Sequence, residues 1–386
     1  MTYTTRLVTE EADFAALASD WGRLYRRCPA ATPFQCHAWL HSWWLSYGAR
    51  GRLRLLLVYD GGPGGDLVAA APLMRVRRPV PALVPLGGAI SDYGDVLVDD
   101  ERGETAVAAL TDALSAAART ALIDLREVRP GGAAERVYAC WRGPRHRVAD
   151  SLCLELPAVP MRKLVARLPS AKAQQRVWAK LRRLDALGVQ RHVVSPDAVD
   201  AALERLLALH RLQWRGRNVT PEHVRDRFHA HLLRSVGAMA RSGDAVVTEF
   251  RMPSVYATTG TAGLDDAAGE VVAVDVTLLS PRLAGGYLYG AHPVLREHKA
   301  DVAVMLLDAC TTHVKDGTYD TLSLLRGDEP YKHHWRPERV VNQRLLLARR
   351  RTAPLMAAVL CDVAARHRGK DVLRHYRERR GAAASS

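Results

Sequence analysis

The richest set of reactive side chains in the sequence lies in the ten residues from Arg326 to Trp335. These residues directly follow 319–325, an apolar stretch that predicts a β-strand. Loops at the ends of strands are where α/β proteins place reactive groups. The segment is therefore the first candidate site, and it holds two carboxylates, a phenol, two cations and two imidazoles: Arg326, Asp328, Glu329, Tyr331, Lys332, His333 and His334.

These residue types match what acyl transfer to an amine requires. The reaction needs a base for the ammonium proton, donors for the oxyanion and an acid for the leaving group. Asp328 or Glu329 would act as the base and Tyr331 as the acid. Arg326 and Lys332 would hold an anionic group of a substrate. The same segment also fits a solvated charged turn that is stiffened by a proline and packed over aromatic rings.

A turn in the first half of the chain offers a second group of polar side chains. Asp92, Tyr93 and Asp95 stand around a glycine in a short turn-forming segment. We expect them to bind the acceptor substrate, although ordinary turn chemistry explains the same residues.

Length and composition limit the class of protein. A chain of 386 residues with 48% hydrophobic content fills two cores, at roughly 150 residues per domain. The net charge of +14 favours partners that are polyanions, such as a nucleotide-bearing cofactor, RNA or an anionic surface. These numbers leave the oligomeric state open.

Several kinds of site are not expected. The six cysteines form no C-x-x-C pair, and His37 and His41 lack the glutamate of the zinc protease motif. The sequence has no Walker loop, no G-x-G-x-x-G and no G-x-S-x-G elbow. Since there is no secretory signal and no apolar run of about 18 residues, we expect a cytoplasmic protein without a metal or a transmembrane segment.

The spacing of apolar residues predicts an α/β protein built in layers rather than a helical bundle. In the first half we expect helices at 11–27, 34–47 and 104–119, a hairpin of 53–59 with 67–73, and strands within 83–98, 121–128 and 152–156. The second half repeats this order, with helices at 161–187, 197–214, 221–241 and 300–315 and strands at 245–251, 254–262, 270–278, 286–291, 319–325 and 340–347. The helix at 161–187 is strongly basic.

Several segments together resemble one known family. Residues 325–335, Leu-Arg-Gly-Asp-Glu-Pro-Tyr-Lys-His-His-Trp, look like the carboxy-terminal signature of GNAT-superfamily acetyltransferases of the CelD type, which include cellulose-biosynthesis proteins. That family is structurally related to the Fem-type peptidoglycan aminoacyltransferases. The front half agrees with it in Thr32-Pro33-Phe34-Gln35, Trp39-Leu40, Trp43-Trp44, Ala71-Pro72-Leu73 and Ser91-Asp92-Tyr93-Gly94-Asp95.

The resemblance spans residues 30–348 and implies two tandem GNAT-like acyl-CoA N-acyltransferase domains. We place these domains at 1–158 and 159–351, followed by a basic helical tail at 352–386 with a disordered end. The implied enzyme is an N-acetyl- or N-acyltransferase that uses acetyl-CoA or another acyl-CoA. Its acceptor would be an amine or hydroxyl of a small molecule, a saccharide or a cell-envelope or secondary-metabolite compound.

The sequence departs from the family pattern where coenzyme A would bind. The family has a serine-proline-glycine turn before a helix, which lets backbone N–H groups approach a pyrophosphate. This chain has Lys299-Ala300-Asp301 in that place. Arg296 and Lys299 are therefore the residues that we expect to bind the cofactor, by charge.

Two other functions stay open. Fem-type enzymes take an activated amino acid from transfer RNA, and the basic helix at 161–187 would track RNA phosphates in a tRNA-dependent aminoacyltransferase. The same helix equally fits a solvated cationic face, because Trp178 is the aromatic residue interleaved among its charges. The third interpretation is a non-catalytic family member that acts as a scaffold.

Overall fold

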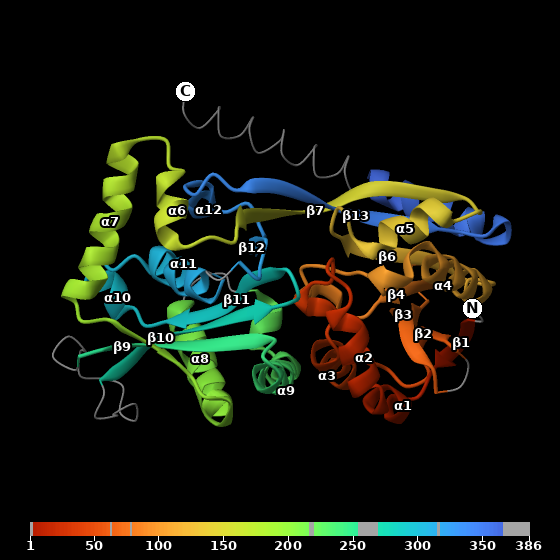
Figure 1. The fold of residues 1–386 in the computed structure, drawn as a ribbon, viewed down its shortest axis with the longest axis horizontal. Coiled ribbons are helices and arrows are strands. Elements are labelled where there is room, and N and C mark those ends of the chain that lie inside the picture. Colours follow the sequence, from red (N-terminus) through yellow and green to blue (C-terminus); the bar gives the residue numbers. More distant parts are fainter. Residues whose placement is uncertain are drawn as a thin grey trace.

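The computed structural model describes residues 3–61, 64–77, 79–215, 220–253, 269–314 and 317–365. Its described strands form one sheet in the order β1-β2-β3-β4-β6-β13-β7-β12-β11-β10-β9-β8, with β5 paired to β3 beside this path. Helices cover the sheet over its whole length (Figure 1). The α/β layering predicted from the sequence is confirmed, whereas the predicted strand at 254–262 and the tail beyond 365 lie outside the described residues.

The first half contributes five helices and seven strands to the described part of the chain. The helices are α1 (Glu11–Ala16), α2 (Ala18–Arg26), α3 (His37–Tyr47), α4 (Gly103–Ala117) and α5 (Ala133–Cys140). The strands are β1 (Tyr3–Val8), β2 (Leu53–Asp60), β3 (Asp66–Val76), β4 (Ala82–Pro85), β5 (Leu97–Val98), β6 (Leu122–Val128) and β7 (Arg145–Pro157).

The second half follows the same plan. Its described helices are α6 (Met161–Ala166), α7 (Ala171–Ala186), α8 (Val199–Gln213), α9 (Asp226–Ser242), α10 (Val294–Glu297), α11 (Val302–His313) and α12 (Pro330–His333), and residues 353–365 are helical as well. Its described strands are β8 (Gln190–Val193), β9 (Ala245–Met252), β10 (Glu270–Leu279), β11 (Leu283–Ala291), β12 (Thr321–Arg326) and β13 (Glu338–Leu347).

The prediction of one continuous helix at 161–187 is wrong. The chain forms α6 and α7 with a break between them, because Pro169 cannot continue a helix. Ser170 then caps α7, with its hydroxyl accepting a hydrogen bond from the Ala173 backbone N–H at 3.2 Å. The loop expected after residue 325 also contains a short helix, α12, which begins at Pro330.

The two halves are joined by two long strands at the centre of the sheet. Strand β13, from the end of the second half, pairs with β6 of the first half on one side and with β7 on the other. Strand β7, which leads out of the first half, pairs with β12 of the second half. The sheet is continuous because the two halves exchange these strands: β13, from the second half of the sequence, lies beside β6, and β7, from the first half, lies beside β12 (Figure 1).

The tryptophan-rich helix α3 forms the core between the halves. It packs on α9 of the second half, and Trp39 is fully buried. The Trp39 indole N–H donates to the Ser91 hydroxyl at 2.8 Å, and its ring meets those of His231 and Tyr287 edge-on. A buried ring of this size contributes a large apolar area. The packing fixes Tyr287 against the first half, at the edge of the cavity described next.

Candidate active site

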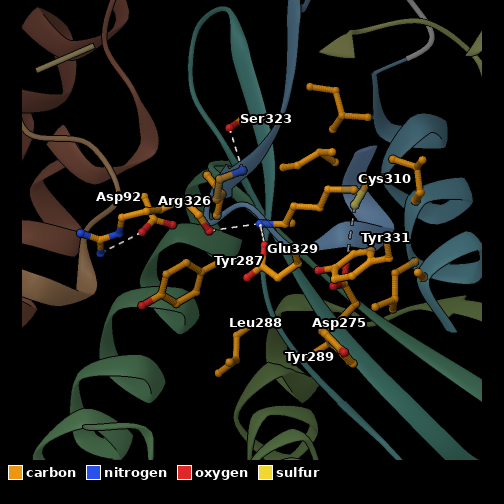
Figure 2. Close-up of a pocket in the computed structure, with 18 of the residues that line it drawn as sticks. Asp92, Asp275, Tyr287, Leu288, Tyr289, Cys310, Ser323, Arg326, Glu329 and Tyr331 are labelled. Carbon is orange, nitrogen blue, oxygen red and sulfur yellow. Dashed lines mark hydrogen bonds and ion pairs between the residues drawn. The ribbon is translucent and has the colours of Figure 1, made fainter. Parts of the chain in front are cut away.

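A cavity of about 480 Å³ opens between β11 and β12 of the second half. The segment 89–92 of the first half closes one side of it, so residues from both halves line the space. Figure 2 shows Arg326 and Asp92 at one end of the cavity and Cys310, Asp275 and Tyr331 at the other. Its polar lining consists of Asp92, Thr220, His223, Asp275, Tyr287, Tyr289, Cys310, Ser323, Arg326, Glu329, Tyr331 and Lys332.

The cavity exists because two parallel strands separate. Strands β11 and β12 pair from Leu283 to Gly285 and from Thr321 to Ser323, and they part beyond those residues. Leu325 adopts a positive φ of 58°, and the register of β12 against β7 shifts in the same stretch. A side chain at Gly285 would meet the Leu325 side chain at 3.0 Å, so glycine lets the strands come together just before they diverge.

Strand β11 carries an irregularity at the point of divergence. Val276 of β10 pairs with Leu288 and Thr277 pairs with Gly286, so Tyr287 is an extra residue in β11. Such a bulge interrupts the ladder and changes the direction of local backbone groups. Backbone N–H groups of β11 beyond Gly285 have no partner strand on the β12 side, which makes them candidate donors to an oxyanion in the cavity.

Asp275 lies at the inner end of the cavity, on β10. Asp275 is only 3% exposed, and burial raises the pKa of its carboxyl group to about 7. The Thr277 hydroxyl donates to its Oδ2 at 3.1 Å, which opposes the shift, and the Cys310 thiol lies 4.0 Å away. No cation of the described chain is among the causes of its shift. A carboxyl with this pKa can accept a proton near neutral pH.

Two further titratable groups of the cavity are neutral at pH 7. Burial, together with the nearby Asp275, raises the pKa of the Cys310 thiol far above its usual value, so it is not a thiolate nucleophile. Burial and the neighbouring His210 lower the pKa of His223 to about 4, so its ring is uncharged. Asp275 is therefore the group at this end whose protonation changes in the physiological range.

Tyr331 is the residue that the sequence predicts as the acid. It lines the cavity from α12, is 49% exposed, and burial of its ring together with Glu329 raises its pKa to about 12. The phenol therefore keeps its proton at neutral pH. The catalytic role of Tyr331 stays a prediction.

Arg326 is held by the first half of the molecule. Its guanidinium contacts the Asp92 carboxylate at 3.0 Å and the Glu127 carboxylate at 3.2 Å, and it donates to the Ala89 carbonyl at 2.6 Å. Burial raises the pKa of Asp92, while Arg326 opposes that rise. The geometry supports a role for Arg326 in joining the halves at the cavity mouth; binding of a substrate anion by Arg326 and Asp92 stays a prediction.

The side chains of Lys332, Glu329 and Asp328, on the same loop, point in different directions. Lys332 is buried, and its ammonium group donates to the Arg326 carbonyl at 3.1 Å and pairs with Glu329 at 2.8 Å. Glu329 also lines the cavity, and the Lys332 ammonium group neutralises its charge. Asp328 does not line the cavity; it pairs at the surface with His333 at 2.6 Å and Arg339 at 3.3 Å.

Neither Tyr93 nor Asp95 lines the cavity. Tyr93 lies in the contact between the halves, whereas the hydrogen bonds of Asp95 stay within the first half. The buried Tyr93 hydroxyl donates to Glu155 at 3.0 Å and contacts the Ser323 hydroxyl at 2.8 Å. The Asp95 carboxylate accepts from the backbone N–H groups of Ala133 and Ala134 at 2.9 and 2.7 Å, at the start of α5. Their geometry supports structural roles, and their roles in substrate binding stay predictions.

Arg296 and Lys299, expected to bind the cofactor, also lie outside the cavity lining. Arg296 lies in α10, and Lys299 lies in the turn between α10 and α11. At the start of α11, the Asp301 carboxylate accepts from the Val304 backbone N–H at 3.0 Å and pairs with Lys180 at 2.6 Å. A carboxylate thus occupies the helix end where a pyrophosphate would otherwise be attracted.

Comparisons with known proteins agree with this architecture. Residues 171–333 match the family model of the acetyltransferase (GNAT) domain. This stretch of the second half is therefore a GNAT acetyltransferase domain. The matched residues contain the strands β9 to β12, Asp275 and the loop from Arg326 to His333. No curated protein matches the chain.

Solved structures share the fold of this chain at low sequence identity. FemX has a TM-score of 0.58 at 10% identity, covering 89% of this chain and 97% of its own. The C-terminal domain of a putative lysylphosphatidylglycerol synthetase from Agrobacterium fabrum has a TM-score of 0.53 at 11% identity, covering 90% and 95%. L-PGS from Bacillus licheniformis has a TM-score of 0.52 at 12% identity, covering 91% and 96%.

The sequence interpretation missed Asp275, which lies inside the GNAT domain. Its signal was present: the strand from Glu270 to Leu279 is apolar at almost every position, and Asp275 interrupts it with a charge. A buried, unpaired carboxyl is costly, so it marks a functional candidate. Among the residues that the structure describes, no cluster of His, Cys, Asp or Glu could hold a metal ion, and no helix is long and apolar enough to cross a bilayer.

Proposed function

We propose that the cavity between β11 and β12 is where this enzyme transfers an acyl group to an amine. The observation that carries the proposal is Asp275, a buried carboxyl with a pKa of about 7 at the inner end of that cavity. Two neighbouring groups meet the other requirements of the reaction. The backbone of β11 offers donors for an oxyanion, and Tyr331 offers a proton for the leaving group.

The proposed reaction is a direct attack on the acyl carbonyl carbon. Asp275 takes the proton that the acceptor ammonium must lose, and the amine nitrogen then forms the C–N bond. The carbonyl oxygen becomes an oxyanion facing the unpaired N–H groups of β11. When the intermediate collapses, the bond from carbon to the leaving sulfur or oxygen breaks, and Tyr331 supplies the leaving group with a proton. The Tyr331 phenolate then takes up the second proton that the nitrogen loses as the amide forms. Asp328 takes no part in this scheme, because it points to the surface.

The first candidate donor is an acyl-CoA, as the family resemblance implies. The thioester would enter between the separated strands, with the acceptor approaching from the side that Asp92 and Ile90 of the first half form. Coenzyme A would supply an activated acyl group. Its pyrophosphate would lie near Arg296 and Lys299 rather than on the N-terminus of α11, which Asp301 occupies.

The second candidate donor is an aminoacyl-tRNA. The capped N-terminus of α11 favours this donor, as do the exposed Lys172, Arg176 and Arg182 of α7, which are near the half-exposed ring of Trp178 in sequence. FemX and lysylphosphatidylglycerol synthetase, which share the fold, support aminoacyl transfer as the type of reaction. Lys180 and Arg183 are engaged within the protein, by Asp301 and by the His298 carbonyl.

One experiment tests the activity and separates the donors. Acetyl-, malonyl- and long-chain acyl-CoA are screened for a rise in melting temperature, and each is then incubated with the enzyme and a panel of amines. Mass spectrometry detects acylated amines, and the same reaction is run with lysyl-tRNA and with the Lys172, Arg176 and Arg182 triple alanine variant. Product from a CoA thioester supports the first donor, and product from lysyl-tRNA that the triple variant loses supports the second. Product formation that Asp275→Asn leaves unchanged would overturn the proposed site.

A further inference from the structure

A second concave surface, in the first half of the molecule, is lined by arginines. Two adjoining cavities, of about 850 and 230 Å³, share Asp112, Ser115, Arg349 and Arg350. Together they form a groove between the C-terminal ends of α4 and α5 and the turn at 349–352, and we call it the arginine groove. Its cations are Arg119, Arg142, Arg349, Arg350 and Arg351.

The groove is held in place by close backbone contacts. The Trp141 indole N–H donates to the Ala348 carbonyl at 2.9 Å, and the Ala348 backbone N–H donates to the Pro144 carbonyl at 2.8 Å. A Cβ at Gly143 would lie 2.2 Å from the Ala348 carbonyl oxygen, so only glycine allows this approach. These contacts place Arg142 beside Arg349, although the two are far apart in sequence.

The charges of the groove are not neutralised within the described chain. Some arginines elsewhere on the described surface pair with carboxylates, as Arg23 does with Asp20 and Arg227 with Glu222. For the five arginines of the groove no ion pair occurs among the described residues, and Asp112 is the carboxylate among the residues that line it. The surface is therefore strongly cationic, and its arginine side chains repel one another unless a bound anion neutralises them.

Helix dipoles explain only part of this pattern. Arg119 follows the C-terminus of α4 and Arg142 follows that of α5, where cations are favourable. Arg349, Arg350 and Arg351 lie instead on a short 3-10 turn and gain nothing from such an end. Guanidinium groups bind phosphate oxygens bidentately, so several of them in one groove suit a ligand with several phosphates.

We propose that the arginine groove binds the phosphate groups of a polyanionic ligand. The contact is with phosphate rather than with bases, because Trp141, the aromatic residue of the lining, is buried and hydrogen-bonded and has no free face for stacking. The phosphates belong either to a small polyphosphorylated compound or to the backbone of a nucleic acid. The proposal is independent of the acyl-transfer mechanism, because the groove shares no residue with the cavity at Asp275.

Binding measurements with the full-length protein test the groove. Tripolyphosphate and a short RNA duplex are titrated at low salt into the wild-type protein, into the triple variant Arg349→Ala, Arg350→Ala, Arg351→Ala, and into a control. The control replaces Arg26, Arg234 and Arg241 by alanine, which removes the same charge elsewhere, since these exposed arginines line a separate cavity between α2 and α9. We expect the groove variant to bind about tenfold more weakly or worse, and wild-type affinity for the RNA to fall steeply as salt is raised.

The two probes identify the source of the phosphates. Binding of tripolyphosphate indicates a small ligand, and binding of the duplex alone indicates nucleic acid. The single variants Arg350→Glu and Arg119→Glu, on exposed side chains, give the same answer should the triple variant fold poorly. The proposal is overturned if neither probe binds the wild-type protein, or if binding falls no further in the groove variants than in the control with Arg26, Arg234 and Arg241 replaced.

Discussion

The two halves of the molecule each contain a pair of parallel strands that separate, but only one of these gaps contains the cavity described above. In the first half β4 and β6 pair at Ala82–Leu122 and Leu83–Ile123 and then part. Gly94 lies between their ends: its backbone N–H donates to the Glu127 carbonyl at 2.9 Å, and a Cβ there would lie 2.5 Å from the Arg126 carbonyl oxygen. The chain itself thus fills the gap.

In the second half the corresponding gap, between β11 and β12, contains the cavity with Asp275. The segment that fills the first gap continues from residues 89–92, which line the second one. A repeated architecture therefore does not carry a repeated site in this molecule. The first half supplies a wall and an anchor for Arg326, and the second half supplies the reacting groups.

The substitution that should lower activity most lies in the open gap between β11 and β12. Replacing Asp275 by Asn removes the proposed base while preserving shape, and we expect kcat to fall by about 1,000-fold. Asp308→Asn on α11 is the matched control, because burial also raises the pKa of Asp308 but its side chain does not line the cavity. An equal loss in both variants would mean that the effect comes from folding and not from the site.

The same substitution should stabilise the fold in alkaline solution. The pKa of Asp275 is about 7 in the folded state, against an ordinary 3.8, so burying its charge costs stability as pH rises from about 4 to about 7. The cost is absent below that window and complete above it, at about 4 kcal/mol for a shift of this size. We expect Asp275→Asn to raise the free energy of unfolding at pH 8 but not at pH 4, as measured by urea denaturation. A difference that does not depend on pH would exclude the raised pKa.

These effects could not be read from the sequence, although much of the architecture could. The hairpin at 53–59 and 67–73 and the tryptophan helix were predicted because their apolar spacing and turn residues act locally. Asp275 was missed because its importance depends on where β12 leaves β11, which is a tertiary contact. For the same reason the sequence does not show that Asp328 faces His333 and Arg339; its role as a base stays a prediction.

Two glycines, one in each gap, distinguish the filled gap of the first half from the open gap of the second. Gly94→Ala should reduce the free energy of unfolding by about 2 kcal/mol, because its methyl group would overlap the Arg126 carbonyl. At Gly286 the nearest atom to an added Cβ is the Cys310 sulfur at 3.4 Å, so the fold should tolerate alanine. The methyl group would instead occupy the cavity and lower kcat/KM by about tenfold. Thermal unfolding and steady-state kinetics on both variants check this, and a reversed pattern would contradict the comparison.

The smallest expected effect concerns the leaving group. Tyr331→Phe removes the proton donor, but a thiolate leaves without much help because a thiol has a pKa of about 8.5. With an acyl-CoA donor we therefore expect kcat to fall by about tenfold or less. An aminoacyl ester has a poorer leaving group, so a much larger loss with lysyl-tRNA than with acyl-CoA would favour the RNA donor. No loss with either donor would remove Tyr331 from the mechanism.

The pH dependence of kcat/KM tests the central claim most directly. If Asp275 is the base, the rate of acyl transfer should rise with pH and level off through an apparent pKa of about 7, because the carboxylate form is the active one. Asp308→Asn should keep this limb, and the residual activity of Asp275→Asn should lack it. A limb near pH 7 that persists in Asp275→Asn would contradict the assignment of the base and of the site.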